Sequence, residues 1–434
     1  MHHSGSDSIS ELCALSAGAR ARLLELVGGL DEAQWLGPKL TIVNPPLWEA
    51  GHVGWFEERW CLRYRGDGGL AASMMPRADA LYDSARVDHD TRWDLPLPDM
   101  ATTLDYLATV RTAAEARFQQ HAGDREAAYF RMLSIFHEQM HCEALTYTRQ
   151  TLAYPAAGGS GVMPGSWPLN SFCTGDVEIP GGHFQLGACE DEGFVFDNEK
   201  WAHAVVVRPF RMARTAVTCA EFAEFVDAGG YLDRGFWSGQ GWSWRTREGA
   251  LAPVYWKRDG KIWCRRVNDR LEPLAEREPV AHVNWYEAEA WCRWAGRRLP
   301  SEAEWEFAAS TVPGSPDIKR RYPWGGAAPS PATANLHGGA GRCIAVDALP
   351  AGDSAWGMRQ MLGNVWEWTA DWFRPYPGFV RDPYAEYSEP WFGNHKVLRG
   401  GCHATSPEMI RNTWRNFYTP DRRDVFAGFR TCAL

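Results

Sequence analysis

The sequence has no Cys-x-x-Cys pair, no block of basic residues and no apolar run approaching about eighteen residues. The cysteine spacing excludes zinc-finger modules, so the eleven cysteines are expected to be mostly buried thiols without a disulfide framework. A net charge of -9 without a basic block gives no reason to expect nucleic acid as a partner. The absence of a long apolar run, and a start without a basic-then-apolar signal, predict no membrane partner and a cytoplasmic protein.

A change of composition divides the chain into two regions. The 434 residues are too many for one ordinary core, and the 45% hydrophobic and 23% charged content is typical of soluble globular proteins. Residues 154–161 are rich in Pro, Gly and Ser, which indicates a linker. We therefore predict an α+β multidomain protein with a helical domain at 1–155 and a second domain at 156–434.

Helical periodicity is concentrated in the first region. Apolar residues recur at helical spacing in residues 9–30, after Pro45-Pro46, in residues 100–121 and from Arg125 to Leu152. Four such helices with connections of mixed length predict a four-helix bundle. The second region is rich in Gly, Trp and short β-like runs, with helices expected at 218–228, 285–296 and 301–310.

Two histidines of the last predicted bundle helix indicate a metal site. His137 and His141 lie one turn apart on one helix face, where two imidazoles can bind the same zinc or iron ion. His52, in the aromatic stretch of the second helix, is the best candidate for a third ligand because bundle cores build metal sites from facing helices. The alternatives are surface histidines at 137 and 141, and a core histidine at 52 bonded to a backbone carbonyl.

The same residues also fit the His-Glu-x-x-His pattern of zinc proteases, in which Glu138 would be the general base. That reading needs a third ligand at a particular downstream spacing, and Glu143 follows His141 too closely for the usual geometries. A zinc hydrolase therefore remains an alternative.

Longer motifs resemble known families. The first 150 residues resemble the DinB-type bundle, whose three metal histidines fall as His52, His137 and His141 do here. The second region resembles the formylglycine-generating-enzyme fold, a modified C-type lectin domain. Its matching segments are Ile179 to Phe184, Val280 to Trp285, Arg298 to Glu306, Gly363 to Trp368, Leu398 to Gly401 and Phe426 to Arg430.

The order of the two domains resembles the ergothioneine sulfoxide synthases and their ovothiol and selenoneine relatives. This resemblance implies iron(II) and O2 chemistry that joins sulfur or selenium to a histidine-derived imidazole. Formylglycine-generating enzymes carry a copper-binding cysteine pair shortly before the terminal Gly-Phe-Arg, whereas residues 411–424 contain no Cys here. Copper oxidase chemistry is therefore not expected.

The resemblance also implies roles for residues of the second domain. Tyr384, with Tyr387 nearby, is the expected proton donor beside the metal. Asn416 and Phe417 are expected to contact hercynine, the trimethylammonium form of histidine, since aromatic faces bind quaternary cations. Arg422 or Arg423 would pair with a carboxylate.

Arginines of the first domain are the other candidates for substrate contact. Arg86 and Arg92, between the second and third helices, are expected to bind substrate, with surface ion pairing as the alternative for each.

Three positions depart from the usual ergothioneine pattern. Met140 replaces a common Gln, Phe417 replaces a common Trp, and Tyr418 replaces an acidic residue that helps hold γ-glutamylcysteine. Loss of that acid disfavours γ-glutamylcysteine, and an aromatic, hydroxyl-rich lining suits a selenosugar donor.

The prediction is an iron(II), O2-dependent synthase that forms a C–Se bond, or a C–S bond, on hercynine. Alternatives are an ergothioneine sulfoxide synthase using γ-glutamylcysteine or cysteine, a zinc hydrolase and a lectin-like binding module. A structural calcium ion in the second domain is a further expectation, without assigned ligands.

Overall fold

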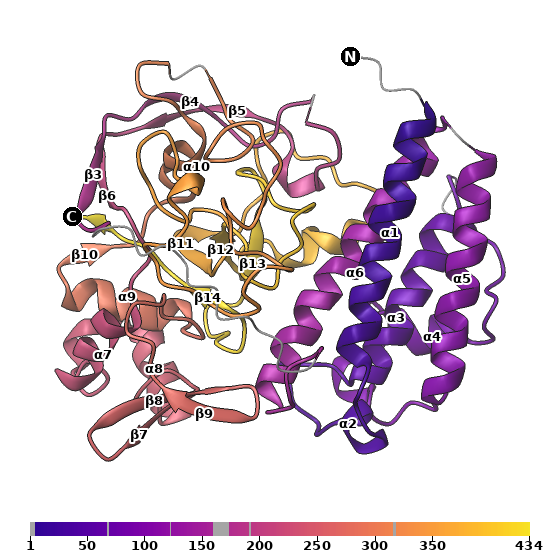
Figure 1. The fold of residues 1–434 in the computed structure, drawn as a ribbon, viewed down its shortest axis with the longest axis horizontal. Helices are drawn as coiled ribbons and strands as arrows, with labels where there is room; N and C mark the ends of the chain where they lie inside the picture. The colour runs from indigo at the N-terminus through magenta and orange to yellow at the C-terminus, as the bar shows by residue number, and fades with distance from the viewer. Residues whose placement is uncertain (1–4, 67–68, 122, 159–172, 191, 316–317) are drawn as a thin grey trace. The chain divides into compact units, whose positions relative to one another are not determined.

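The computed structural model describes residues 5–66, 69–121, 123–158, 173–190, 192–315 and 318–434. By its internal contacts the chain divides into two compact units, Met1–Gly161 and Val162–Leu434. The sequence places the division after residue 155, slightly earlier. Figure 1 shows the helices of unit 1 and the mixed helices and strands of unit 2.

The described part of unit 1 is built on four long helices, α1 (Gly5–Val27), α3 (Pro46–Glu58), α5 (Met100–Gln120) and α6 (Arg125–Thr151). All four were predicted from the sequence, and the four-helix bundle is confirmed. Pro46 occupies the first turn of α3, where its missing N–H costs no hydrogen bond. Side chains of Asp99 and Asp124 cap the first turns of α5 and α6.

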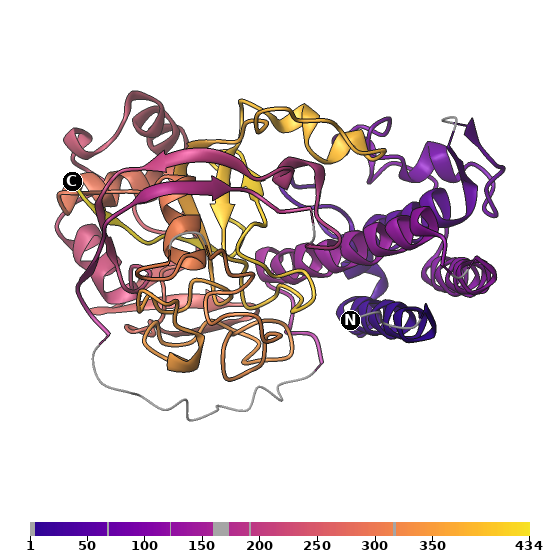
Figure 2. The same cartoon turned by 90° about the horizontal axis from the view of Figure 1, so that it is seen from above.

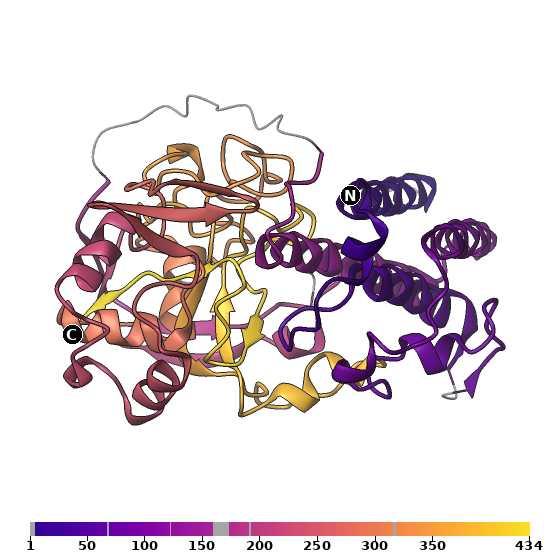
Figure 3. The ribbon, with the colours of Figure 1, turned by 90° about the horizontal axis from the view of Figure 1, so that it is seen from below.

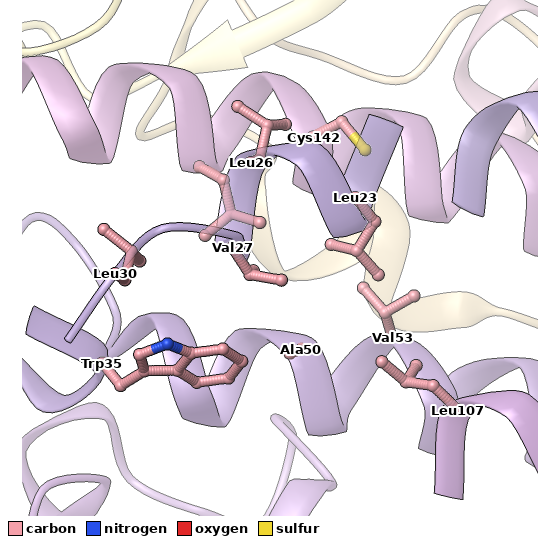
Figure 4. Packing of buried hydrophobic residues seen from close by; sticks show 10 residues of the cluster. Leu23, Leu26, Val27, Leu30, Trp35, Ala50, Val53, Leu107 and Cys142 are labelled. Carbon is pink, nitrogen blue, oxygen red and sulfur yellow. The ribbon is translucent and has the colours of Figure 1, made fainter. Parts of the chain in front are cut away.

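Helix α6 packs against both α1 and α3 (Figure 3). The inward faces of these three helices, with Leu30, Trp35 and Leu107, form a cluster of buried apolar side chains (Figure 4). Its members are Leu23, Leu26, Val27, Leu30, Trp35, Ala50, Val53, Leu107, Cys142 and Leu145. Burial of these side chains holds α6 against the rest of the bundle.

Short elements join the long helices. They are α2 (Glu32–Leu36), α4 (Ala78–Tyr82), the two-residue strands β1 (Tyr64–Arg65) and β2 (Gly69–Leu70), and a 3₁₀ turn at His89–Thr91. Helix α3 continues into a π-helical turn, η1 (Arg59–Arg63), directly before β1.

The described residues of unit 2 form two four-stranded sheets with several smaller elements. One sheet has the order β10 (Arg297–Arg298), β15 (Cys432–Ala433), β6 (Phe210–Ala213), β3 (Asp176–Ile179). The other has the order β13 (Asn416–Tyr418), β12 (Lys396–Arg399), β11 (Trp366–Trp372), β14 (Ala427–Gly428). In the second sheet β12 pairs antiparallel with β11 and β13, whereas β11 pairs parallel with β14.

Strands β4 (Gly182–Leu186) and β5 (His203–Val207) form a two-stranded ribbon (Figure 2). A separate sheet contains β7 (Trp256–Asp259), β8 (Ile262–Val267) and β9 (Arg270–Pro273). The helices of unit 2 are α7 (Cys219–Asp227), α8 (Gly239–Glu248), α9 (Trp285–Trp294) and α10 (Glu302–Ser310). Helices α7, α9 and α10 match the predicted segments, and α8 was missed.

Residues of several sequence motifs form buried ion pairs in the core of unit 2. Arg430 of the terminal Gly-Phe-Arg donates to both carboxylate oxygens of Glu367, at 2.6 and 2.7 Å, and both side chains are buried. Arg399 pairs with Glu302 at 3.0 Å. These buried charges are neutralised by one another, as burial requires.

All eleven cysteines lie in the described residues, and each is a free thiol. In the described part of the chain, no helix combines the length and apolar character that crossing a membrane would need.

Candidate metal centre

Three imidazoles meet between α3 and α6. His52 comes from α3, while His137 and His141 lie one turn apart on α6. The Nε2 atom of His137 is 3.2 Å from that of His52 and 3.1 Å from that of His141. Among the described residues, this is the one group of three or more His, Cys, Asp or Glu side chains arranged to hold a metal ion. The fold thus brings together the three residues named from the sequence.

Two of these rings are oriented through their other nitrogen. The Nδ1–H of His52 donates to the backbone oxygen of Tyr82 at 2.7 Å, and that of His141 donates to Oε1 of Glu49 at 2.7 Å. These bonds assign the proton to Nδ1 and leave the Nε2 lone pair for a ligand. Gly51 allows Tyr82 to approach, because a Cβ at this position would overlap the Tyr82 ring.

Aromatic rings enclose the imidazoles. The Trp48 ring stacks on His52 with centroids 4.8 Å apart, and the Trp55 ring also stacks on His52, at 5.5 Å. The Phe56 ring lies parallel to His137 at 3.5 Å. Burial, with a contribution from the neighbouring imidazoles, lowers the pKa of His52 and His137 well below the ordinary value. Both rings are therefore neutral at pH 7, as metal ligands must be.

This donor set fits a metal ion that accepts nitrogen ligands. Separations of 3.1 and 3.2 Å between neighbouring Nε2 atoms match two ligands held at roughly 2.1 Å from one ion. Lone pairs that converge at this distance repel one another unless a cation lies between them. Because no carboxylate belongs to the set, a divalent ion would keep its charge for anionic guests.

The Glu138 side chain serves the core of the bundle. Its Oε1 accepts from Nε of Arg20 at 2.7 Å, and its Oε2 accepts from a terminal nitrogen of Arg111 at 2.5 Å. The side chain is 1% exposed. A general base needs a free lone pair within reach of a substrate proton, so this geometry disfavours the zinc-hydrolase alternative.

Glu57 completes this buried network. It accepts hydrogen bonds from the guanidinium groups of Arg20, Arg111 and Arg131. Although burial alone would raise it, the pKa of the Glu57 carboxyl is lowered to about 2 by the three guanidinium charges. The carboxylate is therefore charged throughout the ordinary pH range.

The other predicted site residues of unit 1 differ in their surroundings. Met140 is half-buried on α6, directly before His141. Arg86 is 75% exposed and lies 3.4 Å from Asp83, in a surface ion pair. Arg92 is buried, and its guanidinium lies 3.9 Å above the Trp48 ring. Arg86 thus matches the surface alternative, whereas Arg92 supports the aromatic wall of the metal centre.

The predicted tyrosines of unit 2 lie in an aromatic cluster. Tyr384 precedes a 3₁₀ turn, Ala385–Tyr387, and its ring centroid is 6.1 Å from that of Tyr387. Tyr387 stacks on Phe196 at 4.2 Å and meets Phe417 edge-on at 5.9 Å. Burial raises the pKa of Tyr387 above its ordinary value, so its hydroxyl remains protonated.

The predicted substrate loop begins on β13. Asn416 and Tyr418 are half-buried on this edge strand. Arg422 donates to both carboxylate oxygens of Asp424, at 2.6 and 2.7 Å, and lies 5.2 Å from the centre of the Tyr418 ring. Arg423 lies 3.9 Å from a buried carboxylate of α9. Asp424 thus binds the guanidinium nitrogens of Arg422 that were predicted from the sequence to pair with a substrate carboxylate.

Sequence reasoning missed the outer partner Glu49. It precedes His52 by three residues and therefore lies on the same face of α3, which is the signal that could have found it. The carbonyl of Tyr82 carried no such signal, because any residue can supply a backbone oxygen.

Comparison with known proteins identifies both regions. Residues 17–145 match the DinB superfamily, and residues 168–433 match the sulfatase-modifying factor enzyme 1-like domain. The chain is 40% identical to "Hercynine oxygenase" of Mycobacterium tuberculosis over 98% of either chain. It is 39% identical to the protein of that name from Mycolicibacterium smegmatis, over 95% of this chain and 96% of the relative. "Formylglycine-generating enzyme" of Streptomyces coelicolor is 34% identical over 60% of this chain and 88% of its own length.

Fold and site define a two-domain protein, a DinB-type bundle with a three-histidine cluster followed by a domain of the formylglycine-generating-enzyme type. Both domain assignments made from sequence motifs are confirmed. The chain belongs to the hercynine oxygenase family.

Proposed function

We propose that this protein is an iron(II)-dependent, O2-consuming oxidoreductase that forms a carbon–selenium bond at the imidazole of hercynine, with a selenosugar as the selenium donor. The observation that carries the proposal is the convergence of three imidazole Nε2 atoms, two of them from buried histidines that aromatic rings stack on. Membership of the hercynine oxygenase family supports hercynine as the substrate.

His52, His137 and His141 would hold the iron, which when bound supplies O2 activation and a binding position for an anionic selenolate or thiolate. The chain fixes these ligands before the metal arrives. The Tyr82 carbonyl and the Glu49 carboxylate hold His52 and His141 in the productive tautomer and orientation. The aromatic rings stacked on His52 and His137 help to bury these two imidazoles, which strengthens the electrostatic contacts they make.

The proposed hercynine contacts are Asn416, Phe417 and Met140. Flat aromatic faces attract a trimethylammonium group, and Phe417 belongs to a cluster in which its ring lies parallel to Phe373 at 4.0 Å. Met140 offers a flexible, apolar contact beside the ligand His141.

The surroundings of Arg422 support a neutral donor. γ-Glutamylcysteine carries two carboxylates and an ammonium group, so its binding calls for free charged partners. The Arg422 fork is occupied by Asp424, and Tyr418 stands where an acid would hold the ammonium group. A hydroxyl-rich selenosugar needs neither charge, and phenolic and amide groups can bond its hydroxyls.

Tyr384 is the proposed proton donor and Tyr387 its aromatic support. The phenolic O–H of Tyr384 would donate a proton as the new bond forms, while Tyr387, stacked between neighbouring rings, keeps that segment in place.

A sulfur-transferring reaction is the second candidate, favoured by the 40% identity to a hercynine oxygenase over nearly the whole chain. Product mass spectrometry separates the two. Protein loaded anaerobically with iron(II) is given hercynine and O2 together with a selenosugar, γ-glutamylcysteine or cysteine in parallel.

We expect a selenium-containing hercynine product with the selenosugar and little product with either thiol. A sulfoxide formed from a thiol would establish the second candidate. No product from any donor in iron-loaded protein would contradict both.

A further inference from the structure

A second cavity lies in unit 1, apart from the three histidines. Its volume is about 270 Å³, and it is lined by residues of η1, β1, the end of α5 and the start of α6. No histidine of the metal centre lines it. The π-helical turn Arg59–Arg63 widens the backbone here, and π-helical turns occur frequently at functional sites.

One wall of this cavity is aromatic. The Trp60 and Phe130 rings stack with centroids 5.3 Å apart, inclined by only 13°. The Tyr64 ring lies 5.0 Å from Trp60 and 4.9 Å from Phe130. All three residues line the cavity, where the planar ring of a ligand can pack against them.

The opening of the cavity carries charges of both signs. Arg65 and Arg117 supply guanidinium groups, and Asp124 and Glu126 supply carboxylates. In the part of the chain that the structure describes, none of these four side chains lies within ion-pair distance of an opposite charge. All four are exposed; Arg117 donates to the Leu62 carbonyl and Asp124 caps α6, which holds one cation and one anion in place at the cavity.

A buried donor lies among the lining residues. Arg131 is 1% exposed, and two of its guanidinium nitrogens bond Glu57 and Ser16. Its Nε is buried without a hydrogen-bond partner among the described residues. A buried N–H without a partner is costly, so a ligand that supplied an acceptor here would gain affinity. Burial raises the pKa of the neighbouring Cys61 thiol to about 11, so that thiol is neutral and poorly nucleophilic.

We infer that this cavity is a second ligand site, for a zwitterion with a planar ring, such as a free aromatic α-amino acid. The ring of the ligand packs on Trp60, Phe130 and Tyr64. Its carboxylate pairs with Arg65 or Arg117, and its ammonium group pairs with Asp124 or Glu126. The site does not depend on the proposed reaction.

The cavity is also in contact with the metal centre through one intermediate ring. Trp60 lies 6.1 Å from Phe56, and Phe56 stacks directly on His137. Phe56 is therefore the one ring between the cavity wall and the His137 imidazole. This contact gives the second site a physical route to iron affinity.

Calorimetric titration of the metal-free, full-length protein tests the assignment. The probes are L-phenylalanine, phenylethylamine, which lacks the carboxylate, 3-phenylpropionate, which lacks the amine, and glycine, which lacks the ring. L-Phenylalanine is expected to bind saturably, and each partial probe should bind more weakly by roughly fivefold or more, the contribution of a charged hydrogen bond or of ring packing.

Variants locate the bound probe. Glu126→Gln and Arg117→Gln should each weaken L-phenylalanine binding, and Ala127→Trp should abolish it by filling the cavity. Arg125→Gln is the matched control, because Arg125 is an exposed residue of the same helical turn that does not line the cavity. Absence of saturable binding, or binding unaffected by Ala127→Trp and by both charge variants, would overturn the inference.

Discussion

Substitution of Glu138 distinguishes a structural role of its carboxylate from a catalytic role. Replacement of Glu138 by Gln removes the charge that neutralises Arg20 and Arg111 inside the bundle. Glu57 would then be the one buried carboxylate left for the three buried guanidinium groups of the described network, beside the partly exposed Glu115. Removing one partner of a buried ion pair costs roughly 3–5 kcal/mol because the remaining charge is left without compensation.

The expected loss is large enough for calorimetry. A domain of this size loses about 2–4 °C in unfolding temperature per kcal/mol, so Glu138→Gln should lower that of unit 1 by roughly 6–20 °C. Glu115→Gln is the matched control, since Glu115 lies 3.5 Å from Arg131 and its side chain is 33% exposed. A partly exposed pair of this kind contributes at most about 1 kcal/mol.

The rate of the proposed reaction on hercynine supplies the second half of the test. At saturating iron and below the unfolding temperature, Glu138→Gln should retain its rate within about threefold, because Glu138 faces the core. A general base would instead contribute roughly 10²–10⁴-fold to the rate. An unchanged unfolding temperature combined with a rate loss of this size would refute the structural role of Glu138 and make it a catalytic group.

Three further predictions concern the metal site, the buried network and the proton donor. Glu49→Gln weakens the hydrogen bond that orients His141, so iron(II) affinity should fall roughly 10–100-fold in anaerobic equilibrium dialysis, and an unchanged affinity would contradict the orienting role. The pKa of Glu57 is about 2 in the folded protein against an ordinary 4.5, so its stabilisation is complete above pH 4.5 and is lost as the pH falls toward 2. Accordingly, the gap in unfolding free energy between wild type and Glu57→Gln, measured by urea denaturation, should narrow over that range; a constant gap would exclude this linkage. Tyr384→Phe should slow product formation by roughly 10²–10⁴-fold while iron binding stays unchanged, and a wild-type rate would remove Tyr384 from the proposed role.

Local periodicity explains why much of unit 1 could be predicted. The spacing of four residues between His137 and His141 determines their shared helix face, and the aromatic stretch around His52 indicated a buried helix. Glu138 shows the limit of such reasoning. Its position in a familiar pattern suggested catalysis, but its partners, Arg20 and Arg111, lie 118 and 27 residues away in sequence. Only tertiary packing determines which way that carboxylate faces.

Unit 2 was predictable through motifs more than through periodicity. Helices α9 and α10 begin at capping boxes, Asn284 with Glu287 and Ser301 with Glu304, which are signals visible in the sequence. Helix α8 was missed because it begins Gly-Gln-Gly and is mostly polar. The pairing of Arg422 with Asp424 also went unnoticed, although the two are close in sequence, because a flexible arginine can turn toward either a neighbour or a substrate.

No sequence motif indicates the second cavity. A π-helical turn, the end of one helix and the start of the next come together there, and the aromatic wall draws on Trp60, Tyr64 and Phe130. Residues of these types are common in helical cores. Only the tertiary structure shows which of these residues line a cavity and can bind a ligand.

Anaerobic iron(II) binding to the wild type and to single-histidine variants shows whether His52, His137 and His141 together hold the metal. We expect one iron per chain in the wild type and loss of stoichiometric binding in His52→Ala, His137→Ala and His141→Ala. His89→Ala is the control. His89 lies outside the cluster, so this variant should bind iron as the wild type does. Stoichiometric iron in all three cluster variants would contradict the proposed metal centre.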